Sequence, residues 1–156
     1  MKRLLIGVSV FVLTLAAAGV ISAQSDPRIG TWKLNVAKSK GTNTPQSETR
    51  TYESSGDNIT LHTEVLNNDG SKQVYGYTGK PDGKDYPWTG QPPGGAEAIS
   101  VKGVGNTFAA ESKKGGKSLF TTKVTFSKDG KVMTQTNKGT DANGQSMNSV
   151  RVYDKQ

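Results

Sequence analysis

The chain has 156 residues, a formal net charge of +7, no cysteine and a single histidine. Without cysteine it cannot form disulfides, thiolate metal sites or a thioether-linked lipid. One histidine leaves no multi-histidine metal site, and the length is that of a single domain. The lysines are dispersed through turn-like segments and do not gather on one face, so we expect no nucleic-acid partner.

The N-terminal residues have the layout of a secretory signal peptide. Two basic residues precede an uncharged apolar stretch at 4–21, which ends with the small side chains of Ser22 and Ala23. We expect cleavage after Ala23, so that 1–23 is a signal peptide with a helix and 24–156 is one mature domain. That domain would be periplasmic or secreted, without stable membrane insertion. An uncleaved membrane anchor is the alternative.

Loss of the signal peptide removes two basic residues from the net +7 and leaves +5. The remaining chain is polar, but its aromatic residues lie inside short alternating runs and are absent from the glycine-rich breaks. A disordered chain does not sort its residues in this way. The first run follows Gly30, where Trp32, Leu34 and Val36 would share one face of a strand.

Further alternating segments follow along the chain, separated by turn signals such as Asn68-Asp69-Gly70 and Asp129-Gly130. No segment shows a helical stripe of more than two turns. The segments predict about nine or ten antiparallel strands, at 30–36, 49–52, 59–65, 73–78, 86–89, 98–102, 107–111, 120–126, 132–137 and 149–153.

We expect an all-β fold, an antiparallel closed barrel of about 8–10 strands. A sheet of this many strands must close or split, because long open edges promote aggregation. Several runs alternate apolar residues with Thr and Ser, which gives little bulk for two dry sheet faces but suits a barrel with a partly polar lumen. A β-sandwich is the alternative.

The first strand also carries a family resemblance. Gly30-Thr31-Trp32 resembles the Gly-x-Trp signature of lipocalins, and the wider pattern resembles small exported bacterial lipocalin-like (calycin-like) proteins. The resemblance implies a β-barrel that binds a small apolar molecule. It also implies that Arg151, on the last strand, caps Trp32 and closes the barrel floor by a cation–π contact.

A set of aromatic residues with polar ends, together with one arginine, is denser than a minimal core requires. Such side chains suit a wet lumen or a binding face. The alternative is that they fill the barrel as cross-strand pairs. The candidate ligand-binding residues are Arg50, Tyr52, Tyr75, Tyr77, Tyr86 and Trp88.

No catalytic constellation is recognisable, so we expect no enzyme, no catalytic residue, no cofactor and no metal. His62 alternates with Leu61 and Thr63 and should point outward. The first hypothesis is an exported barrel that binds a small apolar ligand in its lumen. The second is an envelope interaction or stress module that binds a protein or polysaccharide and has no ligand cavity. A hydrolase or isomerase with an unrecognised site ranks last, and the oligomeric state stays open.

Overall fold

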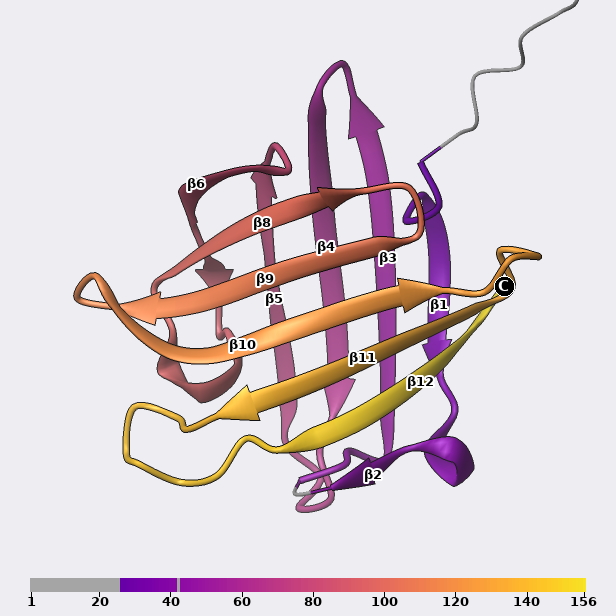
Figure 1. The fold of residues 1–156 in the computed structure, drawn as a ribbon. Helices are drawn as coiled ribbons and strands as arrows, with labels where there is room; N and C mark the ends of the chain where they lie inside the picture. The colour runs from indigo at the N-terminus through magenta and orange to yellow at the C-terminus, as the bar shows by residue number, and fades with distance from the viewer. Residues whose placement is uncertain (1–25, 42) are drawn as a thin grey trace, which may run out of the picture.

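The protein is described by a computed structural model that covers residues 26–41 and 43–156 (Figure 1). The expected signal helix within 1–23 lies outside these described residues. In the described part, none of the helices has the length and apolar character needed to cross a membrane.

The described residues form twelve antiparallel strands, which confirms the predicted all-β class. All ten predicted segments overlap strands of the structure, and the two-residue strands β2 and β7 make up the difference in number. Two short 3-10 helices, η1 (Val36–Lys38) and η2 (Pro93–Gly95), lie in connections. The strands are β1 (Gly30–Leu34), β2 (Lys40–Gly41), β3 (Ser47–Ser55), β4 (Asn58–Leu66), β5 (Lys72–Gly79), β6 (Asp82–Pro87), β7 (Thr89–Gly90), β8 (Ala98–Val104), β9 (Thr107–Lys114), β10 (Lys117–Phe126), β11 (Val132–Gly139) and β12 (Ser149–Lys155).

The strands belong to one sheet with the order β6-β8-β9-β10-β11-β12-β1-β3-β4-β5-β7, and β2 pairs with β12. β6 and β7 lie at the two ends of this order, yet only Trp88 separates them in the chain. β6 pairs with β8 and β7 pairs with β5, so the stretch 82–90 joins both edges and nearly closes the barrel. The continuous sheet rules out the sandwich of two separate sheets. Figure 1 shows β8 to β12 crossing in front of β1, β3, β4 and β5.

The first strand is shorter than predicted. β1 ends at Leu34, and Val36 lies in η1 and is 45% exposed, so the prediction that Val36 shares a strand face with Trp32 and Leu34 is wrong. The side chain of Asn35 accepts a hydrogen bond from the backbone N–H of Lys38 at 3.1 Å. Asparagine favours such local caps over a continued strand, and this cap turns the chain away from the sheet.

The turn between β10 and β11 shows how the predicted Asp-Gly sites work. The Asp129 carboxylate accepts hydrogen bonds from the backbone N–H of Lys131 at 3.1 Å and from the hydroxyl of Ser127 at 2.5 Å. Gly130 has a φ of 67°, which glycine adopts without a steric penalty. The residue pair therefore fixes a tight reversal between neighbouring strands.

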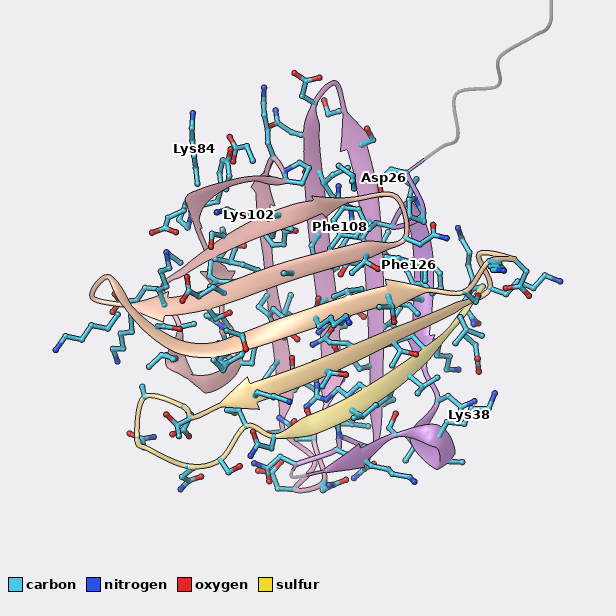
Figure 2. The ribbon with its side chains drawn as sticks, viewed as in Figure 1. Asp26, Lys38, Lys84, Lys102, Phe108 and Phe126 are labelled. Carbon is cyan, nitrogen blue, oxygen red and sulfur yellow. The ribbon has the colours of Figure 1, made fainter. Side chains whose placement is uncertain are left out.

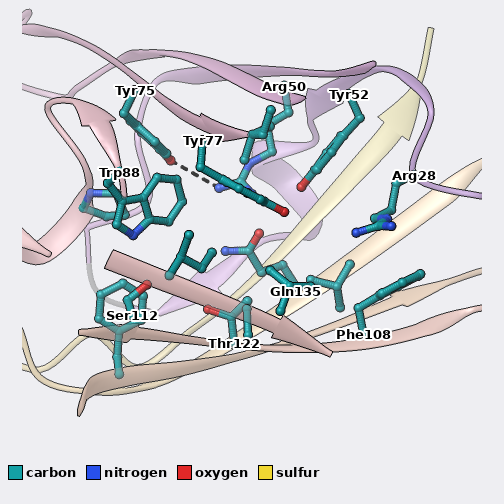
Figure 3. Close-up of a pocket in the computed structure, with 17 residues that line it drawn as sticks. Arg28, Arg50, Tyr52, Tyr75, Tyr77, Trp88, Phe108, Ser112, Thr122 and Gln135 are labelled. Carbon is teal, nitrogen blue, oxygen red and sulfur yellow. Dashed lines mark hydrogen bonds between the residues drawn. The ribbon is translucent and has the colours of Figure 1, made fainter. Parts of the chain in front are cut away.

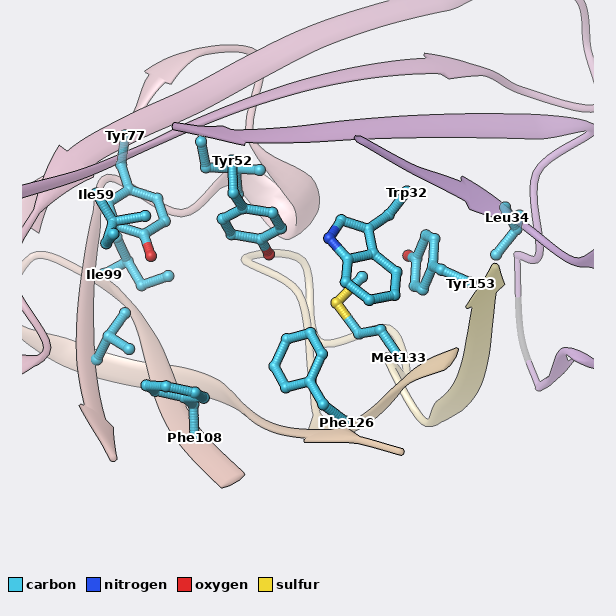
Figure 4. Close-up of a cluster of buried hydrophobic side chains, with 12 residues drawn as sticks. Trp32, Leu34, Tyr52, Ile59, Tyr77, Ile99, Phe108, Phe126, Met133 and Tyr153 are labelled. Atoms are coloured by element: carbon cyan, nitrogen blue, oxygen red, sulfur yellow. The ribbon is translucent and has the colours of Figure 1, made fainter. Parts of the chain in front are cut away.

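The buried core cluster takes side chains from both sides of the barrel, from β1, β3, β4 and β5 and from β8 to β12 (Figure 4). Trp32, Met133 and Tyr153 are fully buried, and the Trp32 ring packs against Phe126 with 5.3 Å between ring centroids. The indole Nε1–H of Trp32 donates to the backbone carbonyl of Arg28 at 2.8 Å. Burial of these large side chains, at roughly 25 cal/mol per Å² of apolar surface, is the main force that holds the two sides of the barrel together.

The predicted contact of Arg151 with Trp32 is wrong. The cation over the indole ring is Lys155, whose Nζ lies 5.1 Å from the ring centroid. Arg151 instead donates from Nη1 to the buried carboxylate of Glu48 at 2.7 Å. Both side chains still link the last strand to the first part of the sheet, through different partners. Figure 2 shows other lysines, such as Lys38 and Lys84, projecting from the outside of the barrel.

Candidate ligand-binding cavity

A cavity of about 60 Å³ lies between the two sides of the barrel (Figure 3). Five of the six candidate residues line it: Arg50, Tyr52, Tyr75, Tyr77 and Trp88. They come from β3, β5 and the β6–β7 junction. The opposite wall is formed mainly by apolar side chains of β8, β9 and β10, among them Ile99, Val101, Phe108 and Val124.

Tyr86 is the candidate that does not reach this cavity. It lies on β6, where its ring packs beside Gly79 and its hydroxyl donates to the Asp82 carboxylate at 3.1 Å. A break in the alternation explains the difference, because the chain changes from one sheet edge to the other between Tyr86 and Trp88. The spacing of two residues no longer fixes a common face once pairing changes partner.

The cavity is small for a ligand site. Pockets that hold drug-sized molecules measure roughly 300–1,000 Å³, whereas a volume of about 60 Å³ holds a few water molecules. An apolar ligand would therefore have to move aromatic side chains out of its way. Trp88 contacts both Tyr75 and Tyr77 edge to face, with ring centroids 5.6 and 5.4 Å apart.

A buried charge cluster adjoins the cavity, which it reaches through Arg50. Arg50 Nε donates to Glu48 Oε1 at 2.6 Å, and Arg151 Nη1 donates to Glu48 Oε2 at 2.7 Å. Arg50 Nη2 also donates to the hydroxyl of Tyr75 at 3.2 Å. Alternation on β3 places Glu48 and Arg50 on the inner face, and Arg151 reaches the same carboxylate from β12.

Electrostatics keep this cluster ionised. Burial raises the pKa of Glu48, but the charges of Arg50 and Arg151 outweigh burial and hold that pKa below its ordinary value. Burial likewise lowers the pKa of Arg50, and the charge of Glu48 reverses the effect and raises it well above its usual range. Burial, with the nearby Glu48 charge, raises the pKa of Tyr75 to about 12. Tyr75 therefore stays a neutral phenol at physiological pH.

Arg28 is a second cavity-lining guanidinium, which sequence analysis missed. It lies before β1, is 4% exposed, and its guanidinium sits 4.2 Å from the centroid of the Phe108 ring. Two of its nitrogens bind the Asp26 carboxylate, Nη2 at 2.6 Å. Asp26 and Glu48 thus neutralise the two guanidiniums that line the cavity, Arg28 and Arg50, and Arg151, which binds Glu48 from outside the lining, adds one positive charge in excess.

Gln135 is the second cavity residue that sequence analysis missed. It lies on the inner face of β11, 6% exposed, and its Nε2 donates to Asn137 Oδ1 at 3.0 Å. The other amide atom, Oε1, is buried without a hydrogen-bond partner, as is Nε1 of Trp88. Gln135 lies two residues after Met133 in the alternating run 132–137 and therefore shares its inward face. This spacing was the sequence signal that could have identified it.

The other candidate side chains considered in the sequence analysis do not line the cavity. His62 points outward as expected and lies 3.4 Å from Glu64, and both side chains are exposed. Across 26–41 and 43–156, no three His, Cys, Asp or Glu side chains come together in a way that would hold a metal ion.

The sequence matches no family model and no curated protein. Among solved structures, the chain is similar to a protein described as "REP1-NXSQ fatty acid transporter", with a TM-score of 0.57. The two chains share a fold. The match covers 82% of this chain and 95% of the other at 15% sequence identity. The β-barrel expected from the sequence is therefore supported at the level of architecture.

Proposed function

We propose that the barrel binds a small, mostly apolar molecule in its interior, with fatty acids as the first class to test. The observation that carries the proposal is a cavity inside the barrel that combines an apolar wall with aromatic residues and a guanidinium, Arg50. Two further facts support it. The structurally similar protein is described as a fatty acid transporter, and the excess positive charge around the cavity favours a ligand with one anionic end.

Ligand entry requires the cavity to expand. The rings of Trp88, Tyr75 and Tyr77 touch only at their edges, and contacts of this kind contribute roughly 0.5–1.5 kcal/mol beyond apolar burial. Displacing them costs less than breaking the Glu48 cluster, since breaking a buried ion pair costs about 3–5 kcal/mol. We therefore expect the aromatic side chains to move when a ligand enters, and Trp88 fluorescence should report that movement.

The test is a titration of the mature protein with saturated fatty acids of increasing chain length, followed by tryptophan fluorescence and native mass spectrometry. We expect saturable quenching and a one-to-one complex. Ala110→Leu, which adds bulk on the cavity wall, should weaken binding at least about tenfold. Ala109→Leu is the matched control, because Ala109 is exposed on the same strand, and it should leave affinity unchanged. Absence of saturation at any chain length contradicts the proposal.

The small cavity volume favours a second candidate, an envelope interaction or stress module whose outer surface binds a protein or polysaccharide. In that case the interior polar groups hold water and the barrel only supports the surface. Cross-linking in intact cells would then recover one reproducible partner, and Ala110→Leu would not affect its recovery. Loss of the partner in Ala110→Leu would argue for the lumen instead.

Export belongs to the same proposal. Lys2 and Arg3 followed by the apolar stretch 4–21 support a cleaved signal peptide, with 24–156 as the mature periplasmic or secreted domain. Mass spectrometry of the protein from its own host should give a chain that starts at Gln24 or within a residue or two of it. A chain that retains 1–23 would support the membrane anchor instead.

A further inference from the structure

The inner face of β11 carries an amide that the protein itself does not satisfy. Gln135 lines the cavity together with Trp88, Ser112 and Thr122, and more than nine-tenths of it is buried (Figure 3). Its Oε1 has no hydrogen-bond partner. Buried polar groups in folded proteins are almost always paired, so an unpaired one on a cavity wall points to a partner that enters the cavity.

A chain of hydrogen bonds behind the wall holds this amide in place. Gln135 Nε2 donates to Asn137 Oδ1 at 3.0 Å, and Thr122 Oγ1 donates to the same oxygen at 2.8 Å. Asn137 Nδ2 in turn donates to Ser149 Oγ at 3.0 Å. This network leaves Gln135 Oε1 as a positioned acceptor. If the whole network reversed its direction, the amide nitrogen would take that place, and the ligand would still have to supply a polar partner.

Trp88 presents a second unsatisfied group to the same cavity. Its indole Nε1–H is a donor only, is buried, and has no partner. Edge contacts with Tyr75 and Tyr77 hold the ring. An ionised carboxylate accepts hydrogen bonds but donates none, so a carboxylate near Arg50 cannot satisfy the oxygen of Gln135. A hydroxyl group both donates and accepts, and it therefore suits Gln135 in either orientation as well as Trp88.

We infer that the cavity selects apolar molecules that carry a hydroxyl group on their apolar body, with Gln135 as the specificity-determining residue and Trp88 Nε1 as a supporting donor. The inference rests on the proposed function and narrows its ligand class. A ligand that buries these groups without pairing them should bind about 5- to 150-fold more weakly than one that pairs them.

One internal partner competes with a ligand for Gln135. Arg151 is its register partner on β12, and Arg151 Nε is also buried without a hydrogen-bond partner. If a rotated Gln135 amide accepts from Arg151, no ligand hydroxyl is needed and the cavity has no preference for hydroxylated molecules. The two arrangements therefore predict different selectivities, which binding measurements distinguish.

The experiment compares hexadecanoic acid with its monohydroxylated derivatives, one for each of several chain positions, by calorimetric titration of the wild-type protein, Gln135→Leu and Thr136→Val. Thr136 lies on the outer face of β11 and serves as the matched control. Circular dichroism checks that each variant is folded. If Gln135→Leu does not fold, Gln135→Met replaces it, because its unbranched side chain keeps a similar length.

At least one hydroxylated acid should bind wild type and Thr136→Val more tightly than hexadecanoic acid, by at least about fivefold. That preference should vanish in Gln135→Leu. Equal affinities in the wild-type protein, or a preference that survives in Gln135→Leu, overturn the inference while the proposed function stands. Absence of binding by every acid contradicts the proposed function, and the inference with it.

Discussion

At the scale of single residues, the charge cluster around Glu48 links the stability of the barrel to the charge beside its cavity. One buried carboxylate faces two guanidiniums, Arg50 at 2.6 Å and Arg151 at 2.7 Å. Removing one partner of a buried pair is far more costly than losing a surface pair, because an uncompensated charge stays behind. The cluster therefore ties β3 to β12 across β1 and holds the guanidinium of Arg50 on the cavity wall.

Glu48→Gln should lower the free energy of unfolding by about 3–5 kcal/mol, since it leaves Arg50 and Arg151 buried without a carboxylate. Glu53→Gln, an exposed change on the same strand, should shift it by less than about 0.5 kcal/mol. Urea denaturation measures both. A small effect of Glu48→Gln would show that water compensates the two arginines.

The same residue should give the protein a defined acid sensitivity. The folded-state pKa of Glu48 lies below its ordinary value of 4.5, so its contribution is complete above that value. The contribution is lost as the pH falls through the lowered folded-state pKa. As the pH falls below 4.5, wild type should therefore lose more stability than Glu48→Gln. Parallel pH profiles would contradict this account of the cluster.

At the scale of elements, the stretch 82–90 decides whether the sheet closes. Its first part pairs with β8 and its last two residues pair with β5, so both edges depend on one short segment. Gly90 has a φ of 73°, and a Cβ added there would collide with the carbonyl oxygen of Val74. That oxygen also accepts the backbone N–H of Gln91 at 2.9 Å.

Gly90→Ala should weaken closure between β5 and β7 and lower the free energy of unfolding by more than about 2 kcal/mol. Gly115→Ala is the matched control, because Gly115 also has a positive φ but nothing lies within 4 Å of the added Cβ. It should cost about 1–2 kcal/mol. Hydrogen exchange of the Gln91 amide should accelerate in Gly90→Ala alone. Unchanged protection at Gln91 would show that closure does not depend on this approach.

At the scale of the whole molecule, sequence analysis succeeded where a feature is local. Period-two alternation located segments that overlap the ten longer strands, and the density of polar-ended aromatic residues singled out Tyr75, Tyr77 and Trp88, which line the cavity. It failed where a feature depends on distant pairing. Arg28 precedes the first strand, and its guanidinium lines the cavity because the fold brings it over the ring of Phe108, which is distant in the sequence. Arg151 meets Glu48 because β3 and β12 flank β1, which no local pattern encodes.

The Trp32 partner shows the same limit. The family resemblance predicted a cation over the indole, and the structure has one, but register places Lys155 there and sends Arg151 inward. Arg151 and Lys155 lie four residues apart on the same face of β12, and the register pairs Lys155 with Trp32. A local pattern does not fix the register, so side-chain partners across the sheet are the least predictable feature. The inward polar residue Gln135 was missed because alternation alone treats a polar side chain as outward-facing.

The central claim is that the interior of the barrel, and not its outer surface, takes up an apolar molecule. The most direct measurement is NMR of the labelled mature protein with a fatty acid that carries a nitroxide on its chain. The account predicts that signals of inward-facing residues around the cavity, such as Val101, Ala110 and Gln135, broaden and recover when the nitroxide is reduced. Broadening confined to exposed residues such as Ala109 and Val74, or no broadening at all, would contradict it.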